Sequence, residues 1–201
     1  MRRVIFLMVF ISTLTAGPAI AADIDGRIGL TGKVGFLMPV QDDFITGVDD
    51  TNTGLAAGGG VIYGIGKNVA AELDITHAPT LNVQAAGGKV GEATLTDISL
   101  GLQYRFTPEQ PLVPYLGAGV DFIKGKFKNL GDRRYGLEWT TGGHVSAGID
   151  YFATRGIALT AELKGIFAPA GNIKTTPQEY NPNSFVGTVG IRLFLPEKIL
   201  D

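Results

Sequence analysis

Apolar residues alternate with small, polar or charged residues along much of this chain, and the alternation is clearest in residues 97–122. In residues 98–106 every second residue is apolar or aromatic, a period of two that is typical of a β-strand with one apolar face. The proline-rich segment 107–111 interrupts the pattern, which resumes with Leu116, Ala118, Val120 and Phe122 on one face. This stretch predicts two antiparallel strands joined by a tight turn.

The same alternation predicts further strands on both sides of this pair. In all, the predicted strands span approximately residues 24–38, 54–66, 69–77, 98–106, 115–122, 139–152, 157–167 and 184–195. Long polar connections at 41–53, 78–91, 125–138 and 168–183 alternate with short turns. In an antiparallel meander this order places every short turn at one end and every long loop at the other, as in outer-membrane barrels. We therefore predict an all-β fold, an eight-stranded antiparallel up-and-down transmembrane β-barrel.

Residues 1–21 have the pattern of a secretory signal peptide. Arg2 and Arg3 give a positive start, residues 4–11 are apolar, and residues 19–21 form an A-x-A cleavage site. We expect cleavage after Ala21 and a single barrel domain over residues 22–201, located in the cell outer membrane with its short turns in the periplasm. No later segment has the roughly 20 apolar residues that a membrane helix needs.

Composition excludes several classes of function. The chain has no Cys, which excludes disulfides and thiolate metal sites. Its two histidines, His77 and His144, do not have metal-ligand spacing, so we expect no metal and no cofactor. Removal of Arg2 and Arg3 lowers Lys+Arg from 17 to 15 against 19 Asp+Glu, a formal charge of −4 that argues against a nucleic-acid partner.

The apolar parity of each strand is expected to face lipid and the polar parity to face the barrel lumen. The reverse assignment would expose charges to lipid, at roughly 2–4 kcal/mol for each Lys or Arg at the bilayer midplane. The predicted lumen-lining residues are Glu72, Asp74, Asp97, Gln103, Arg105, Tyr115, Asp121, His144, Ser146, Asp150, Glu162, Lys164 and Arg192. The predicted aromatic girdles are Tyr63, Tyr104, Phe106 and Tyr151 at the short-turn end and Phe36, Phe122, Trp139 and Phe167 at the loop end.

Several short motifs resemble those of a known family. They are residues 114–120 following residues 102–106, Ala71-Glu72-Leu73, and residues 148–151 with Arg155 in the next turn. Together they resemble OmpW-like outer-membrane proteins over most of the mature chain. The resemblance implies a monomeric eight-stranded barrel that lets small, often hydrophobic, solutes cross the outer membrane and leave the lumen sideways.

The chain departs from that family pattern in two places. Lys164 stands where such proteins tend to have a bulky apolar lumen residue, which puts a hydrophobic gate in doubt. The apolar parity of the last strand ends at Leu195, and a tail of residues 196–201 follows where a terminal aromatic residue is expected.

Three functions are compatible with this barrel. The first is a narrow pore or uptake channel for small, including hydrophobic, solutes; the second is a non-conducting structural or surface-interaction barrel with a plugged lumen; the third is a lipid-modifying enzyme. Counting through the turn at residues 153–155 places Ser146 opposite Glu162 and His144 near Lys164, all inward. An enzyme acting on lipid needs such a triad on its outer face, so we expect a satisfied lumen network, no catalytic residues and no enzymatic activity.

Two features leave alternatives open. Inward charges of both signs could line a polar pore or pair into a network that plugs it. Inward glycines could leave space in the lumen or ease curvature of the wall; they are Gly58, Gly60, Gly64, Gly117 and Gly119.

The expected partners are outer-membrane lipid, lipopolysaccharide and small solutes. In the third long loop, basic residues could bind lipopolysaccharide phosphates or form a solvated loop. These residues are Lys124, Lys126, Lys128, Arg133 and Arg134.

Overall fold

The computed structural model describes residues 23–40, 50–85, 88–131, 133–173 and 179–196. Its long strands are β1 (Ile28–Pro39), β3 (Gly54–Gly66), β4 (Val69–Ala85), β5 (Gly88–Arg105), β6 (Leu112–Asn129), β8 (Thr140–Thr154), β9 (Ile157–Phe167) and β12 (Ser184–Phe194). Short strands are β2 (Asp50–Thr51), β7 (Arg134–Gly136), β10 (Gly171–Asn172) and β11 (Glu179–Tyr180). The predicted signal peptide lies outside the described residues.

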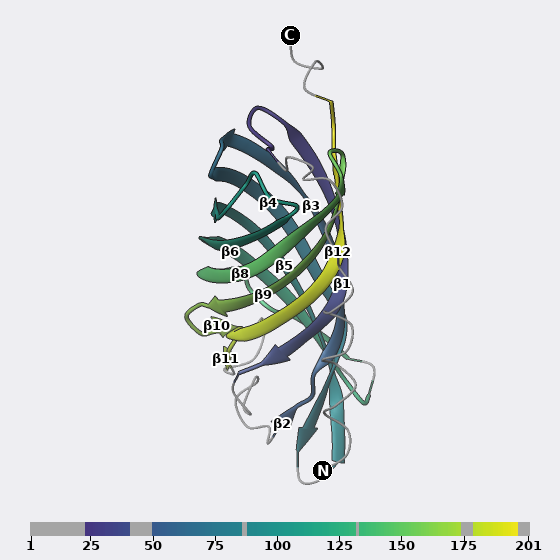
Figure 1. Ribbon diagram of the computed structural model, residues 1–201. Helices are drawn as coiled ribbons and strands as arrows, with labels where there is room; N and C mark the ends of the chain where they lie inside the picture. Colours follow the sequence, from purple (N-terminus) through teal and green to yellow (C-terminus); the bar gives the residue numbers. More distant parts are fainter. Residues whose placement is uncertain (1–22, 41–49, 86–87, 132, 174–178, 197–201) are drawn as a thin grey trace, which may run out of the picture.

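The long strands form a closed barrel (Figure 1). Each pairs antiparallel with the next long strand along the chain, and β1 pairs with β12 to complete the wall. Closure leaves no free sheet edge among these strands, which satisfies their backbone hydrogen-bonding groups without water. The predicted eight-stranded antiparallel barrel is therefore confirmed. Among the described residues there is no helix with the length and apolar character to span a bilayer.

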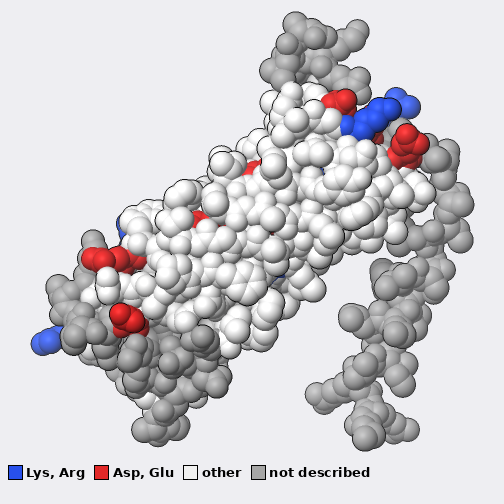
Figure 2. All heavy atoms as spheres, turned by 90° about the vertical axis from the view of Figure 1, so that its left-hand side faces the viewer, with Lys and Arg blue, Asp and Glu red and all other residues white. Residues whose placement is uncertain are grey.

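The period-two pattern determines which side chains point outward. Along the middle of β6, Leu116, Val120 and Phe122 are exposed, whereas Tyr115 and Asp121, which lie next to them in the strand, are buried. The same alternation on the other long strands gives the barrel an apolar outer belt. On the face shown in Figure 2, charged side chains gather towards the two ends and a broad, almost uncharged surface lies between them.

The aromatic residues predicted to form girdles lie on this outer face. Those expected at the short-turn end include Tyr104 and Phe106, whose rings meet edge to face with centroids 5.0 Å apart. Those expected at the loop end include Phe36, Phe122, Trp139 and Phe167, all substantially exposed. Their role as markers of the membrane interface stays a prediction.

The long loop predicted at residues 78–91 is wrong, because β4 continues to Ala85 and β5 begins at Gly88. The register of β4 against β5 shifts between Ala78 and Leu81, so the inward face changes from even-numbered residues such as Thr76 and Ala78 to odd-numbered residues such as Leu81. Beyond this point the strands rise past the apolar belt. There Leu81 and Leu95 are buried inside the barrel, while Thr94 faces outward.

Candidate functional site

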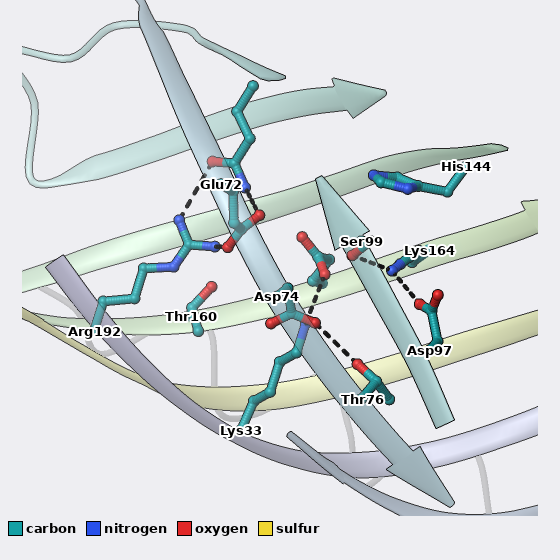
Figure 3. A network of polar contacts seen from close by, with 12 residues as sticks. Lys33, Glu72, Asp74, Thr76, Asp97, Ser99, His144, Thr160, Lys164 and Arg192 are labelled. Carbon is teal, nitrogen blue, oxygen red and sulfur yellow. Dashed lines mark hydrogen bonds and ion pairs between the residues drawn. The ribbon is translucent and has the colours of Figure 1, made fainter. Parts of the chain in front are cut away.

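The middle of the lumen contains a layer of buried ionisable side chains, called here the ionic layer. It comprises Lys33, Glu72, Asp74, Asp97, Arg105, Asp121, His144, Asp150, Glu162, Lys164 and Arg192. These residues come from all eight long strands except β3. They point into the lumen because the residues next to them along each strand are mostly apolar or small and face outward. Figure 3 shows how part of the layer converges from opposite walls.

Arg192 on β12 is the centre of the turn-end part of the ionic layer. Its Nη1 donates to Asp150 Oδ2 at 3.1 Å and its Nη2 donates to Glu72 Oε1 at 3.0 Å. Arg105 Nη2 lies 2.9 Å from the same Asp150 oxygen. The Tyr115 ring lies near both guanidiniums, 5.1 Å from Arg192 and 5.9 Å from Arg105. Two cations thus share one buried carboxylate and one aromatic ring.

Lys164 on β9 is the centre of the loop-end part of the layer. Its Nζ donates to Asp97 Oδ2 at 2.7 Å and to Ser99 Oγ at 2.9 Å. The same nitrogen lies 3.3 Å from Asp121 Oδ1, and His144 Nδ1 is 2.9 Å from that carboxylate oxygen. Lys164 therefore holds two carboxylates from the opposite wall, β5 and β6.

Lys33 on β1 is joined to the turn-end part through Glu162 and Tyr115. Its Nζ lies 3.0 Å from Asp74 Oδ1 and 3.4 Å from Glu162 Oε1. Glu162 also accepts a 3.0 Å hydrogen bond from Tyr115, which contacts Arg192. Of the two alternatives for the inward charges, the structure has the paired network. Burying this many charges is tolerable because each lies in an ion pair and most also form hydrogen bonds. Arg105 is the exception, since its three guanidinium nitrogens have no hydrogen bond to any described residue and it is held by its ion pair with Asp150.

Apolar side chains fill the lumen on both sides of the ionic layer. The turn-end cluster comprises Ile24, Ile62, Ala70, Val113, Phe152, Ala158 and Phe194. The buried residues of the loop-end cluster are Leu37, Ala56, Ala78, Leu81, Val83, Ala93, Leu95, Ile123, Leu137, Ile166, Ile173, Tyr180 and Val186. Most residues of both clusters lie on the inward face of the long strands, where the sequence pattern predicted mainly small, polar or charged residues. Apolar residues at the strand ends of the inward parity were the signal that could have revealed them.

The segment before β1 closes the turn end. Ile24 is fully buried in the turn-end cluster. The Arg27 guanidinium donates to backbone carbonyls of Arg155, at 2.7 Å, and Leu195, at 3.2 Å. It also stacks 5.5 Å from the Phe194 ring centroid. Arg27 therefore joins the start of the barrel to the β8–β9 turn and the end of β12.

The loop end is closed by chain segments that fold over the mouth. Leu137 forms an isolated bridge with Ile173, and both are buried in the loop-end cluster. Tyr180 on β11 donates from its hydroxyl to the Glu138 backbone oxygen at 2.8 Å. Burial, together with the charge of Glu138, raises the pKa of Tyr180 to about 12.

Little space remains inside the barrel. A cavity of about 10 Å³ lies in the ionic layer, lined by Lys33, Glu72, Asp74, Ser99, His144, Ser146, Glu162 and Lys164. This volume suits about one water molecule. The larger hollows lie on the outer wall, and one of about 980 Å³ is lined mainly by outward apolar residues of β1, β8, β9 and β12.

Each predicted lumen-lining residue lies on the inward face of its strand, and the contacts above bring most of them together. Gln103 joins the network by donating to Glu72 Oε2 at 2.6 Å. The prediction omitted Lys33, although the alternation in the first strand placed it on the polar parity. It also omitted two hydroxyl partners, Ser99 and Thr76, the second of which donates to Asp74 at 3.0 Å.

The predicted pairing of Ser146 with Glu162 is wrong. Ser146 lies opposite Lys164, and Gly148 lies opposite Glu162. The β8–β9 turn is centred later than residues 153–155, and a register shift between Phe152 and Thr154 removes only part of the resulting offset. His144 contacts Asp121 in the closed lumen, so these side chains do not form the proposed hydrolase triad. The described residues contain no group of three or more His, Cys, Asp or Glu that could hold a metal ion.

Comparisons with known proteins agree with this architecture. A family model described as "Outer membrane protein beta-barrel domain" matches residues 6–192. The "Uncharacterized outer-membrane protein y4mB" of Sinorhizobium fredii is 34% identical over 113 residues, which cover 53% of this chain. The matched region spans 48% of that protein, about half of its length.

Solved barrels have the same fold at low sequence identity. The outer membrane protein OprG of Pseudomonas aeruginosa has a TM-score of 0.70 and 15% identity, covering 88% of this chain and 99% of OprG. Neisserial surface protein A has a TM-score of 0.62 and 18% identity, covering 84% and 97%. The outer membrane protein AlkL, solved in lipid bilayers, has a TM-score of 0.58 and 16% identity, covering 90% and 95%.

Proposed function

Because the chain belongs to the outer membrane protein β-barrel domain family, we propose that it serves as a closed outer-membrane barrel that does not conduct ions. The observation that supports this proposal is the filled lumen. Paired charges occupy its middle, apolar clusters occupy both ends, and the cavity within the ionic layer is about 10 Å³. An eight-stranded barrel is only just wide enough for side chains to fill. A plugged barrel of this kind supports the membrane and presents its loop end to the cell exterior.

A second function, uptake of small apolar solutes, is favoured by one feature of the wall. The β4–β5 register shift between Ala78 and Leu81 lies beside the loop-end cluster. Pro79 within it has no backbone N–H to donate, so wall pairing is interrupted there. A solute that entered the loop-end cluster would have the ionic layer on its turn-end side and the interrupted β4–β5 pairing beside it. Sideways exit into lipid is the route that avoids the ionic layer.

Two measurements on the purified full-length mature barrel separate these functions. In planar bilayers we expect no single-channel current, with a general porin as positive control. In liposomes, uptake of a small fluorescent apolar solute should match that of protein-free liposomes. Reproducible current steps would overturn the closed barrel.

Uptake without current would instead support the second function. In that case Leu81→Trp, which enlarges a side chain beside the interruption, should reduce uptake. Leu100→Trp on the outer face of β5 is the matched control and should leave it unchanged. Equal uptake by both variants and the unmodified barrel would exclude the route beside Pro79.

A further inference from the structure

The outward face of β6 changes character at one position. From Leu116 to Phe122 its outward residues are apolar, and the next outward residues are Lys124, Lys126 and Lys128. The neighbouring strand β5 changes at the same height, because Ile98 pairs with Phe122 and Thr96 pairs with Lys124. The inward face changes in the opposite sense, from Asp121 to Ile123. The apolar belt on this side of the barrel therefore ends between Phe122 and Lys124.

The lysines above this boundary form a row with a fourth cation. Lys128 pairs in register with Arg134 on β7, and we call Lys124, Lys126, Lys128 and Arg134 the basic ladder. Steps of two residues along a strand are about 7 Å, so the three lysines cover roughly 13 Å. The ladder therefore begins directly at the edge of the belt and continues away from it.

Lys124 and Lys126 of the basic ladder lie opposite uncharged residues on the neighbouring strands. Lys124 lies opposite Thr96 and its Nζ is 5.0 Å from the Trp139 ring centroid. Lys126 lies opposite Thr94 on one side and Gly136 on the other. Within the described part of the chain neither lysine has an ion pair with a carboxylate.

Glu92 on β5 faces the ladder and forms an ion pair with Lys89. Glu92 lies opposite Lys128, but its Oε1 is 2.6 Å from Lys89 Nζ. The hydrogen bond and charge of Lys89, and to a smaller extent the charge of Lys128, lower the pKa of Glu92. On the described residues of β6 and β7, the outward charged side chains above the belt are thus all basic.

We propose that the basic ladder binds the phosphate groups of lipopolysaccharide in the outer leaflet. Lysine side chains at the edge of an apolar belt extend along it and place their ammonium groups at headgroup level. Cations there attract anionic headgroups, at about a fivefold gain in affinity for each lysine. The apolar surface below Lys124 contacts the acyl chains of the same molecule. A lipid-anchored phosphate therefore gains contacts that a free phosphate lacks.

The test uses the mature barrel in zwitterionic detergent and lipid A as probe, with native mass spectrometry to measure bound lipid. Lys124→Gln combined with Lys126→Gln should weaken binding of bisphosphorylated lipid A about five- to twentyfold. The matched control is Lys67→Gln with Arg155→Gln, which removes the same charge from exposed positions at the turn end. This control should bind lipid A like the unmodified barrel. Heat-modified gel mobility verifies that every variant is folded.

Two further binding measurements identify which chemical group of lipid A the barrel recognises. Dephosphorylated lipid A should bind the unmodified barrel as weakly as bisphosphorylated lipid A binds the ladder variant. Millimolar inorganic phosphate should not displace bound lipid A. Equal losses in the ladder and control variants, equal binding of dephosphorylated lipid A, or displacement by free phosphate would each overturn the proposal.

Discussion

Lys33 Nζ lies 3.0 Å from Asp74 Oδ1 although their strands are not neighbours. Strand β3 separates β1 from β4, and at this level it presents two glycines to the lumen. Gly58 pairs with Lys33, and Gly60 pairs with Asp74. The ion pair therefore crosses over a strand that has no inward side chains in its way. Gly60 does not leave open space in the lumen, because atoms of Leu73 and Asp74 closely approach the position where a Cβ would lie.

We expect Gly60→Ala to destabilise the barrel by about 1–3 kcal/mol, in the range of overpacked sites. A Cβ at Gly60 would clash with the Leu73 carbonyl oxygen and would lie 3.0 Å from Asp74 Oδ2. The backbone contact cannot be relieved by rotating a side chain. The free energy of unfolding can be measured by urea denaturation in micelles, followed by the fluorescence of Trp139, the single tryptophan.

Gly32→Ala is the control for this substitution. Gly32 lies on the neighbouring strand β1 and faces outward, and a Cβ at this position would have no atom within 4 Å. The unfolding midpoint of this variant should remain close to that of the unmodified barrel. Equal midpoints for the Gly60 and Gly32 variants would show that the wall adjusts freely and that the contact is unimportant.

Lys164→Met should cost about 3–5 kcal/mol, the usual penalty for breaking a buried ion pair from one side. The substitution leaves Asp97 and Asp121 without the ammonium that lies 2.7 and 3.3 Å from them. Adding Asp97→Asn to this variant should recover part of the loss, because one uncompensated carboxylate is removed. Urea denaturation measures the free energy of unfolding of the unmodified barrel, of Lys164→Met and of the double variant.

Lys67→Met, at an exposed position in a turn, is the comparison for loss of a surface lysine and should change stability by less than about 0.5 kcal/mol. If Lys164→Met were as mild as this control, the ionic layer would not stabilise the barrel. If adding Asp97→Asn lowered the free energy of unfolding further, Asp97 would have a role other than pairing with Lys164.

The sequence predicts the face of Lys164 but not its partners. Period-two alternation places it in the lumen, since its neighbours Leu163 and Gly165 lie on the opposite parity. Asp97 is 67 residues away on β5, and β8 and β6 lie between their strands in the wall. Which side chains meet across the lumen depends on strand stagger and side-chain length. Neither quantity can be read from alternation alone, and the misplaced Ser146 pairing has the same cause.

The predicted loop at residues 78–91 fails for a different reason. Alternation was expected to keep apolar residues facing outward along the whole of each strand. Above the apolar belt that rule reverses, because Leu95 and Ile123 point inward and Thr94 and Lys124 point outward. The reversal follows the change of surroundings from lipid to water. In β4 the reversal is not visible in the sequence, because the bulge beside Pro79 also exchanges the inward and outward positions of the residues that follow.

Arg27→Gln should destabilise the barrel by about 1–3 kcal/mol. The guanidinium loses its hydrogen bonds to the carbonyls of Arg155 and Leu195, which remain buried or partly buried without a donor. Arg155→Gln removes an exposed side chain from the same end and should be close to neutral. Denaturation midpoints that do not differ between the two variants would show that Arg27 does not hold the turn end together.

Tyr180 should make the loop end sensitive to alkaline pH. Its pKa is about 12 in the folded barrel because of burial and the Glu138 charge, whereas an ordinary tyrosine titrates near 10. The folded state therefore holds the phenol proton more tightly than the unfolded chain does. This contribution to stability is complete below about pH 10, declines as the pH rises from about 10 to 12, and is lost above the folded-state pKa.

The comparison that isolates this residue is the difference between the unmodified barrel and Tyr180→Phe, because other tyrosines titrate in both. At pH 9 the variant should be less stable, since it lacks the 2.8 Å hydrogen bond to the Glu138 carbonyl. Between pH 9 and pH 11.5 the unmodified barrel should lose more stability than the variant, so that the two midpoints converge. Tyr104→Phe, at an exposed position on the outer wall, should show no such convergence. Parallel declines for the unmodified barrel and Tyr180→Phe would mean that the Tyr180 proton is not linked to closure of the loop end.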